Sequence, residues 1–145
     1  MKIILAIMTI LLLLAAYGIY LNVTAPKLGV ENGKLAPCPN RPNCVSSQAE
    51  KKLHSIEPLP LSKKGLGPIK KIIENDPNAK IVSESEVYLR AEFRTALGFR
   101  DDVEFLINRD QEVIEVRSAS RVGYNDLDVN RKRIEIIRNR IMADE

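Results

Sequence analysis

An uncharged apolar run from Ile3 to Leu21 sets the strongest limit on how this chain can fold. The run is long enough to cross the hydrocarbon core of a bilayer as one helix, and Lys2 is the only charged side chain before it. A positive charge on the amino side favours a cytoplasmic N-terminus. The sequence therefore predicts a membrane anchor over residues 1–22, with the remaining chain in the periplasm or another extracytoplasmic space.

A cleaved signal peptide is the alternative to an anchor. Ala16-Tyr17-Gly18 places small residues at the two positions that cleavage requires. The apolar run continues past that point through Ile19 to Leu21, which favours an uncleaved helix. No cysteine lies near the end of the run, so lipid attachment is not expected there. Either arrangement places the rest of the chain in an oxidising compartment.

The chain beyond the leader is sized for one domain. Residues 23–37 are rich in proline, glycine and asparagine and are expected to form a linker, followed by a single extracytoplasmic α+β domain over residues 38–145. The whole chain has 22 basic and 19 acidic side chains, so removing Lys2 leaves 21 and 19, a net charge of +2. This near balance gives no reason to expect a nucleic acid partner.

Two cysteines open the domain, in the run C-P-N-R-P-N-C from Cys38 to Cys44. Zinc needs four ligands, and the only other soft ligand is His54, so no metal site and no cofactor are expected. A Cys44–His54 nucleophile pair is a second alternative. The favoured interpretation is a structural disulfide that closes a small loop and stabilises the fold by roughly 2 to 2.5 kcal/mol.

The apolar pattern along the domain predicts an α+β fold. Its period changes from that of a helix to that of strands and back again. The expected elements are an edge strand within residues 49–62 that exposes His54, a helix over 65–75, hairpins over 81–95 and 103–116, and a helix over 126–142. We therefore expect an antiparallel sheet of four or five strands packed against helices and preceded by one N-terminal transmembrane helix.

Register in the second hairpin follows from the same alternation. Apolar residues occupy odd positions on its first strand and even positions on its second, so the numbers of paired residues must have an odd sum. One such register sets Phe105 opposite Ile114. It also sets Glu104 opposite Glu115, which counts against that pairing because like charges repel.

The last helix has a mixed core face. Its apolar stripe is expected to contain Leu127, Asn130, Ile134, Ile137 and Ile141. A buried amide needs hydrogen-bond partners, so Asn130 is expected to bond to the sheet. The basic residues of the helix, Arg131, Lys132, Arg133, Arg138 and Arg140, are expected on other faces, toward solvent or anionic headgroups.

Polar and charged side chains that could bind a ligand or take part in catalysis are concentrated between Arg117 and Arg131. On a strand, Ser118 and Ser120 continue an inward face that is apolar up to that point, so hydrogen bonds replace packing there and Asn130 could meet them. The candidate ligand-binding residues are Arg100, Asp101, Asp102, Arg117, Ser118, Ser120, Arg121, Asp126, Asn130 and Arg131.

Three interpretations of this cluster remain open. The first is a structural network in which Asp101 or Asp102 pairs with Arg117, and Arg121 pairs with Asp126. The second is an anion site in which the arginines gather a carboxylate or phosphate. The third is a catalytic site with a serine nucleophile and a carboxylate base.

Three motifs together resemble the domain-of-unknown-function family 1499. They are C-P-N-R-P-N-C-V-S-S, then G-F-R-D-D-V-E-F, then V-R-S-A-S-R-V-G-Y-N-D-L-D-V-N-R-K-R-I, in the order of that family. The matching positions are Cys38, Pro39, Asn43, Cys44, Ser46, Ser47, Asp101, Asp102, Arg117, Ser118, Ser120, Arg121, Gly123, Asp126, Asn130 and Arg131. The resemblance implies that the cysteine loop and the polar cluster form one unit, and it implies no activity.

The leading functional hypothesis is a non-catalytic, membrane-anchored domain that binds a small anionic or amphipathic ligand or an envelope protein. A hydrolase-like enzyme using the Asp, Ser and Arg cluster is the alternative. A third hypothesis is a structural protein that meets the membrane through its basic last helix.

Overall fold

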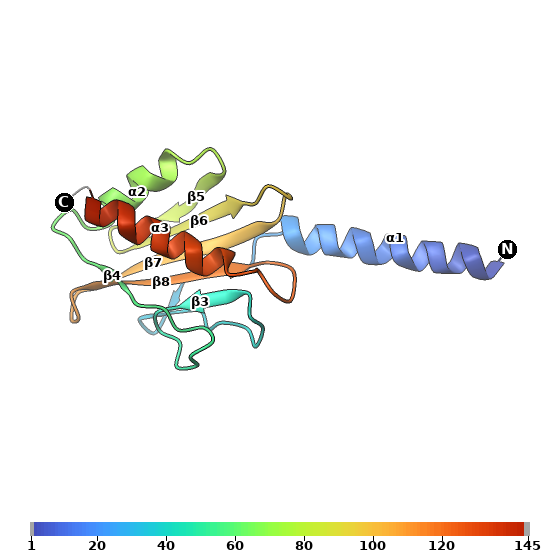
Figure 1. Cartoon of the computed structure of the whole chain (residues 1–145), viewed down its shortest axis with the longest axis horizontal. Coiled ribbons are helices and arrows are strands. Elements are labelled where there is room, and N and C mark those ends of the chain that lie inside the picture. Colours follow the sequence, from blue (N-terminus) through green and yellow to red (C-terminus); the bar gives the residue numbers. More distant parts are fainter. Residues whose placement is uncertain (1, 144–145) are drawn as a thin grey trace.

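The computed structural model describes residues 2–143. A single helix, α1 (Lys2–Val23), projects away from the rest of the molecule, and no residue in it is buried (Figure 1). Within residues 2–143 it is the one helix that is long and apolar enough to span a membrane. The predicted apolar helix is therefore confirmed, whereas its cleavage and the side of the membrane on which the domain lies stay predictions.

Beyond α1 the chain forms an antiparallel sheet with helices packed against it. The strands are β3 (Cys44–Ser46), β4 (Leu59–Pro60), β5 (Ala79–Glu84), β6 (Tyr88–Arg94), β7 (Arg100–Asn108) and β8 (Val113–Ser120). Their order is β3-β8-β7-β6-β5, and β4 also pairs with β8. The α+β class is confirmed, and the sheet has six strands rather than four or five because β3 and β4 are too short to show an alternating pattern.

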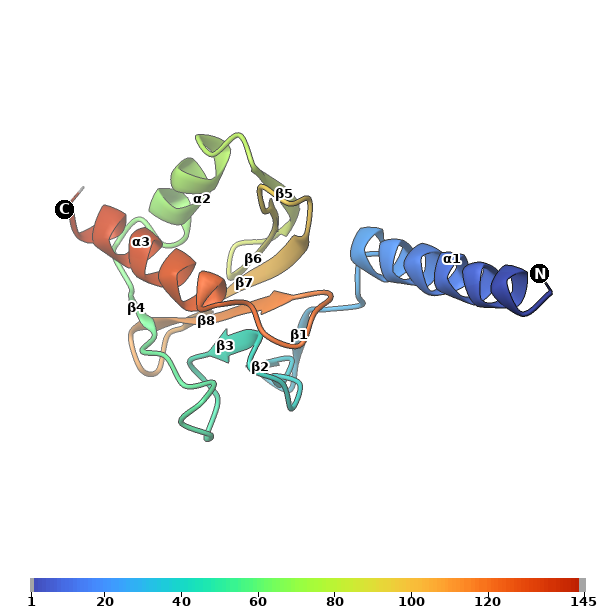
Figure 2. The same ribbon diagram turned by 45° about the vertical axis from the view of Figure 1, so that its right-hand side comes forward.

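Two helices cover one face of this sheet. These are α2 (Gly67–Glu74) and α3 (Val129–Ala143), which contact each other and the sheet (Figures 1 and 2). Pro68 occupies the first turn of α2, as expected, because its missing N–H is not needed there. The core between the layers includes Ile69, Ile73, Leu89, Val103, Phe105, Ile114, Val116, Ile134 and Ile137. Burying each of these side chains contributes roughly 1.5 to 3 kcal/mol.

The β7–β8 hairpin has the expected odd sum but a different register. Phe105 lies opposite Val116 rather than Ile114. The shift of two positions keeps every side chain on its face and replaces the expected Glu104–Glu115 repulsion with a Glu104–Arg117 pair. Electrostatics therefore selects between two registers that the hydrophobic pattern allows equally.

The expected edge strand around His54 is wrong. Residues 51–54 form turns instead, and the side chain of His54 is buried, with 3% of its surface exposed. Its Nδ1 lies 3.0 Å from the carbonyl oxygen of Cys44 and donates to it. This bond fastens the turn to β3.

The start of the last helix also differs from the expectation. α3 begins at Val129, and Leu127, expected in the core stripe, is 79% exposed. Leu127 and Asp128 both have left-handed backbone angles, with φ of 54° and 63°. The other stripe positions, Asn130, Ile134, Ile137 and Ile141, are buried as expected.

The outer edge of the sheet is irregular. β5 pairs only with β6 along the described sheet, and its register shifts between Ile81 and Ser83. The residue between them, Val82, is left out of the pairing and is 44% exposed. This β-bulge bends the edge strand.

Candidate functional site

The face of the sheet opposite α2 and α3 carries a buried lattice of charges. Side chains alternate between faces along a strand, so the polar residues of β6, β7 and β8 share this side. The register sets Arg90 opposite Glu104, and Glu104 opposite Arg117. All three residues are less than a tenth exposed. Charged side chains that are buried this deeply are retained in a fold when each is paired with an opposite charge.

Asp102 lies at the centre of this lattice and holds two arginines. Arg90 Nη2 lies 2.7 Å from one carboxylate oxygen, and Arg121 Nε lies 2.7 Å from the other. Burial by itself raises the pKa of Asp102, but the hydrogen bonds from Arg121 and Arg90 outweigh it and hold that pKa below its usual value. The hydrogen bond to Asp102 also raises the pKa of Arg121. Both groups therefore stay charged.

Glu104 forms the second centre of the lattice. Arg117 Nη1 donates to its Oε2 at 3.1 Å, and the Tyr88 hydroxyl donates to its Oε1 at 2.8 Å. Burial first, and then the charge of Glu104, raises the pKa of the Tyr88 phenol far above its ordinary value. The phenol therefore remains a hydrogen-bond donor, and both carboxylate oxygens of Glu104 are satisfied.

The expected pairing of Arg117 with Asp101 or Asp102 is wrong. The two-residue shift in register places Arg117 beside Glu104 instead. The sequence analysis predicted neither the Glu104–Arg117 pair nor the pairing of Arg90 with Asp102, although these residues lie at polar positions of alternating strands. That alternation was the signal that could have found them.

The expected Arg121–Asp126 pair is also wrong. Arg121 binds Asp102, and its Nη2 lies 2.7 Å from Glu92. Asp126 instead accepts hydrogen bonds from the backbone and the side chain of Asn130, at 2.9 and 2.7 Å. It therefore serves the first turn of α3, where a carboxylate also complements the helix dipole.

Asn130 joins α3 to the helix-facing side of β8. Ser118 Oγ donates to its Oδ1 at 2.6 Å, and its Nδ2 donates to Ser120 Oγ at 3.0 Å. Asn130 and Ser118 are both fully buried. The structure thus confirms the predicted meeting of the serine face with this amide.

Arg133 completes this second cluster, contrary to its expected place on a solvent-facing side of α3. It pairs with Asp101 at 2.5 Å and donates to Ser118 Oγ at 3.0 Å and to Asn130 Oδ1 at 2.8 Å. Its guanidinium also lies 4.9 Å from the centre of the Phe93 ring. The helical pattern missed Arg133 because a long side chain at the margin of an apolar stripe can turn inward.

These contacts leave little for catalysis. Within residues 2–143, Ser118 Oγ bonds to Asn130 and Arg133, neither of which acts as a general base. The carboxylate of Asp101 is held by Arg133. The arrangement therefore fits a network that ties sheet to helix better than a nucleophile with its base.

The two remaining candidates lie at the margins of the clusters. Arg100 pairs with Glu92 at 3.1 Å, and Arg131 donates to the carbonyl oxygen of Ser55 at 2.8 Å. The structure does not bring Arg100 and Arg131 together with Arg117 around an open anion site. The guanidiniums face carboxylates or carbonyl oxygens of the protein itself.

The disulfide loop packs against the same end of the fold. Cys38 and Cys44 are bonded, with their Cα atoms 5.7 Å apart, which confirms the predicted disulfide. Asn43 Nδ2 donates to the carbonyl oxygen of Gly123 at 2.8 Å, and the backbone carbonyl oxygen of Asn43 accepts from Asn130 Nδ2 at 3.1 Å. The loop and the Asn130 cluster thus form one unit, as the family resemblance implies.

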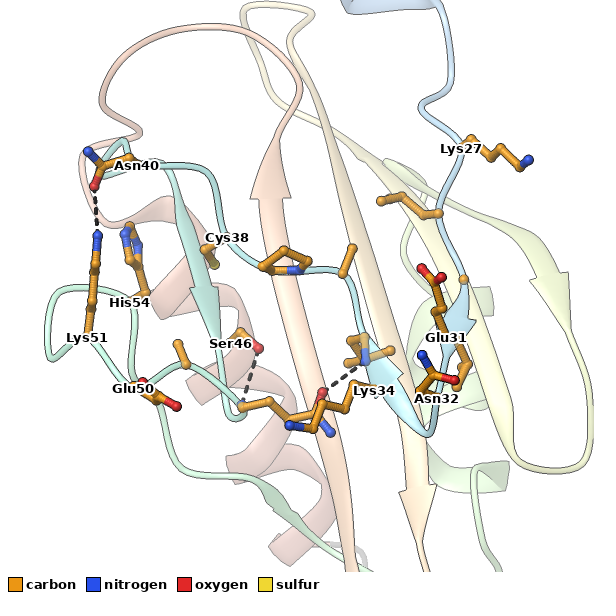
Figure 3. Close-up of a pocket in the computed structure, with 18 residues that line it drawn as sticks. Lys27, Glu31, Asn32, Lys34, Cys38, Asn40, Ser46, Glu50, Lys51 and His54 are labelled. Carbon is orange, nitrogen blue, oxygen red and sulfur yellow. Dashed lines mark hydrogen bonds between the residues drawn. The ribbon is translucent and has the colours of Figure 1, made fainter.

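A groove lies beside this loop. It has a volume of about 970 Å³ and runs between residues 27–38 and residues 40–54. Figure 3 shows Lys27, Glu31, Asn32 and Lys34 on one wall and Asn40, Glu50, Lys51 and His54 on the other. Apolar residues lie between them, namely Leu28, Val30, Leu35, Ala36 and Pro37. The lining thus combines an apolar surface with three lysines and two carboxylates.

His54 is the polar residue of the groove with an unmet bonding capacity. Its Nδ1 bonds to Cys44, whereas its buried Nε2 has no hydrogen-bond partner among the described residues. Because Nδ1 donates, Nε2 of the neutral ring is an acceptor, and it becomes a donor when the ring is charged. A buried polar atom without a partner destabilises the fold unless a water or ligand supplies one.

The sequence analysis missed the groove because its first wall was assigned to a linker. That wall is a hairpin, β1 (Val30–Glu31) and β2 (Lys34–Leu35), turned at Asn32 and Gly33 with φ of 52° and 74°. An Asn-Gly pair suits such a turn because both central residues need positive φ. This dipeptide was the signal that could have found the hairpin.

Among residues 2–143 no group of three or more His, Cys, Asp or Glu side chains is placed to hold a metal ion. Fold and site together define an antiparallel α+β domain with a disulfide-closed loop, behind a helix apolar enough to span a membrane. The chain belongs to the family described as protein of unknown function (DUF1499), whose model matches residues 34–141. No curated protein and no solved structure matches it.

Proposed function

We propose that this chain is a membrane-anchored, non-catalytic binding protein of the extracytoplasmic space. Its ligand is a small amphipathic molecule with an anionic group, held in the groove between the β1–β2 hairpin and the disulfide loop. One observation carries the proposal: a groove with lysines on both walls is lined by His54, whose buried Nε2 lacks a partner among the described residues.

The chemistry of the groove selects the class of ligand. Lys27 and Lys34 form no ion pair within the described residues, and Lys51 bonds only to the amide of Asn40, at 3.1 Å. They are therefore available to an anion, and His54 can donate a directed hydrogen bond to it from Nε2 when its ring is charged. Apolar side chains between the walls favour a ligand with a hydrocarbon portion.

The anchored location rests on α1 and on the disulfide. A helix of this length and hydropathy suits a single membrane span, and a disulfide is stable in an oxidising compartment outside the cytoplasm. We assign a structural role to the polar clusters on the two faces of the sheet, as part of the scaffold that carries the groove.

The test is binding of octanoate to the full chain in lipid nanodiscs, measured by calorimetry, with 1-octanol as the uncharged control. We expect octanoate to bind and octanol to bind more weakly. Lys34→Ala and His54→Phe should each weaken octanoate binding by roughly ten-fold, the usual effect of losing a hydrogen bond to a charged group.

Lys63→Ala is the matched control, because Lys63 is exposed and does not line the groove. It should leave octanoate binding unchanged. Equal binding of octanoate and octanol, or equal affinity in all variants, would show that the lysines and the histidine do not recognise an anion.

A further inference from the structure

Two loops carry exposed apolar residues at the end of the domain from which α1 projects. The β6–β7 loop presents Leu97 and Phe99, which are 84% and 47% exposed. The β8–α3 loop presents Tyr124 and Leu127, which are 71% and 79% exposed. Figures 1 and 2 both show these two loops flanking the end of α1.

Hydrogen bonds fix both loops to the end of α1. Asn22 donates to the carbonyl oxygen of Gly98, between Leu97 and Phe99, at 3.0 Å and accepts from the backbone of Arg100 at 2.9 Å. The backbone carbonyl oxygen of Asn22 accepts from Arg121, the first residue of the β8–α3 loop, at 3.2 Å. Both loops are therefore held at the point where the apolar helix ends.

We propose that these two loops dock the domain onto the phospholipid bilayer that holds α1. The apolar run ends at Leu21, and the next residue, Asn22, already contacts the loops. The tips of the loops thus lie at the level of the bilayer surface. Exposed Leu, Phe and Tyr side chains at this level bury their apolar parts about 5–10 Å into the boundary of headgroups and acyl chains.

The backbone of the β8–α3 loop supports the same proposal. Leu127 has a left-handed conformation, with φ of 54°, which is unfavourable for a bulky residue. Its N–H bonds to Asn125 Oδ1 at 2.7 Å, and the turn directs the side chain away from the core. Holding a leucine outward at the expense of backbone strain is expected where the side chain has an apolar partner outside the domain.

Charges beside the loops also suit a bilayer. Arg94 precedes the β6–β7 loop and is exposed, and Arg41 is exposed where its Nη1 bonds to Gly123 of the β8–α3 loop at 3.5 Å. Arginine binds phosphate strongly through its planar fork of donors. In contrast, Arg133 and Arg138 of α3 bind the protein itself, so these two arginines do not contribute to the docking surface.

The inference rests on the proposed anchor, and the absence of tryptophan from the chain allows the two to be tested separately. Four full-length single-tryptophan variants are reconstituted into phosphatidylcholine vesicles whose acyl chains carry bromine. The variants are Leu97→Trp and Tyr124→Trp for the loops, Leu12→Trp for α1, and Met142→Trp as the control. Met142 is 53% exposed near the far end of α3.

Docking predicts that bromine removes about half of the emission from Leu97→Trp and from Tyr124→Trp, as expected for side chains at the acyl boundary. Leu12→Trp should be quenched more strongly, and Met142→Trp should keep its emission. A Leu127→Asp substitution should reduce quenching of Tyr124→Trp, whereas Met142→Asp should not.

Full emission from both loop variants would overturn the docking proposal, and Leu12→Trp then reports separately whether the anchor holds. Quenching at one loop alone, or at Met142 as well, would also overturn the two-loop arrangement. Quenched loops with an unquenched Leu12→Trp would support docking and reject the anchor.

Discussion

At the scale of residues, the main feature is that buried charges are paired across strands. Asp102 holds Arg90 and Arg121, and Glu104 holds Arg117 and Tyr88. Removing one member of such a pair leaves an uncompensated buried charge, which is more damaging than removing both. Arg117 and Arg121, which suggested an anion site from the sequence, are therefore part of the interior.

The lowered pKa of Asp102 makes the stability of the domain depend on acid. Because the folded pKa lies below the ordinary value of 3.8, the unfolded chain binds a proton first as the pH falls. The stabilisation that ionised Asp102 provides is fully present above pH 3.8. It is lost as the pH falls through the pKa that Asp102 has in the folded protein. Urea denaturation between neutral pH and about pH 2 should show this loss.

Asp102→Asn is the variant for comparison. It should be less stable at neutral pH and should lose part of the acid dependence, since its side chain does not ionise. An unchanged slope of stability against pH in this variant would show that another carboxylate controls the acid response.

At the scale of elements, α3 is joined to the sheet through Asn130 as well as through its isoleucines. Asn130→Leu fills the same space but leaves Ser120 Oγ without its donor and Ser118 Oγ without its acceptor. We expect a loss of roughly 2 to 6 kcal/mol in the free energy of unfolding, at about 1 to 3 kcal/mol for each of the two unsatisfied groups. Denaturant titration measures it.

Asn139→Leu provides the matched control in the same helix, because Asn139 is exposed. Its effect should stay within about 0.5 kcal/mol. Equal effects of the two substitutions would mean that the amide of Asn130 contributes nothing specific.

Sequence patterns predicted the long elements well and the short ones poorly. Alternation and helical spacing identified α2, the two hairpins and most of α3, because each buries one regular face. Two- and three-residue strands such as β3 and β4 carry no period, and they depend on pairing with β8. The register of β7 and β8 needed a choice between Glu115 and Arg117 as the neighbour of Glu104, which apolar spacing does not make.

The candidate site was predicted in part for a similar reason. Strand alternation and helical spacing indicated that Ser118, Ser120 and Asn130 would meet, and they do. The partner of each arginine depends on distances across strands, which a one-dimensional pattern does not contain. The groove depends on a hairpin of two-residue strands, and only its Asn32-Gly33 turn was visible beforehand.

At the scale of the whole molecule, Asn22 joins α1 to the domain through Gly98, Arg100 and Arg121. Asn22→Ala removes the two side-chain hydrogen bonds and should let the domain tilt against the helix. Spin labels at Tyr17→Cys and Met142→Cys should then show a broader distance distribution in nanodiscs than the parent chain.

Asn75→Ala, at the end of α2, is the control and should leave the distribution narrow. An equally narrow distribution in Asn22→Ala would mean that other contacts fix the orientation.

In the membrane-anchored protein that we propose, the bulge at Val82 in β5 affects how neighbouring copies meet. Chains anchored to a bilayer are confined to two dimensions, where neighbours meet side by side at high local concentration. A straight, open edge strand would invite one copy to extend the sheet of the next into a filament. The bulge interrupts the row of backbone donors and acceptors at Val82, so the edge is a poor template for such an extension.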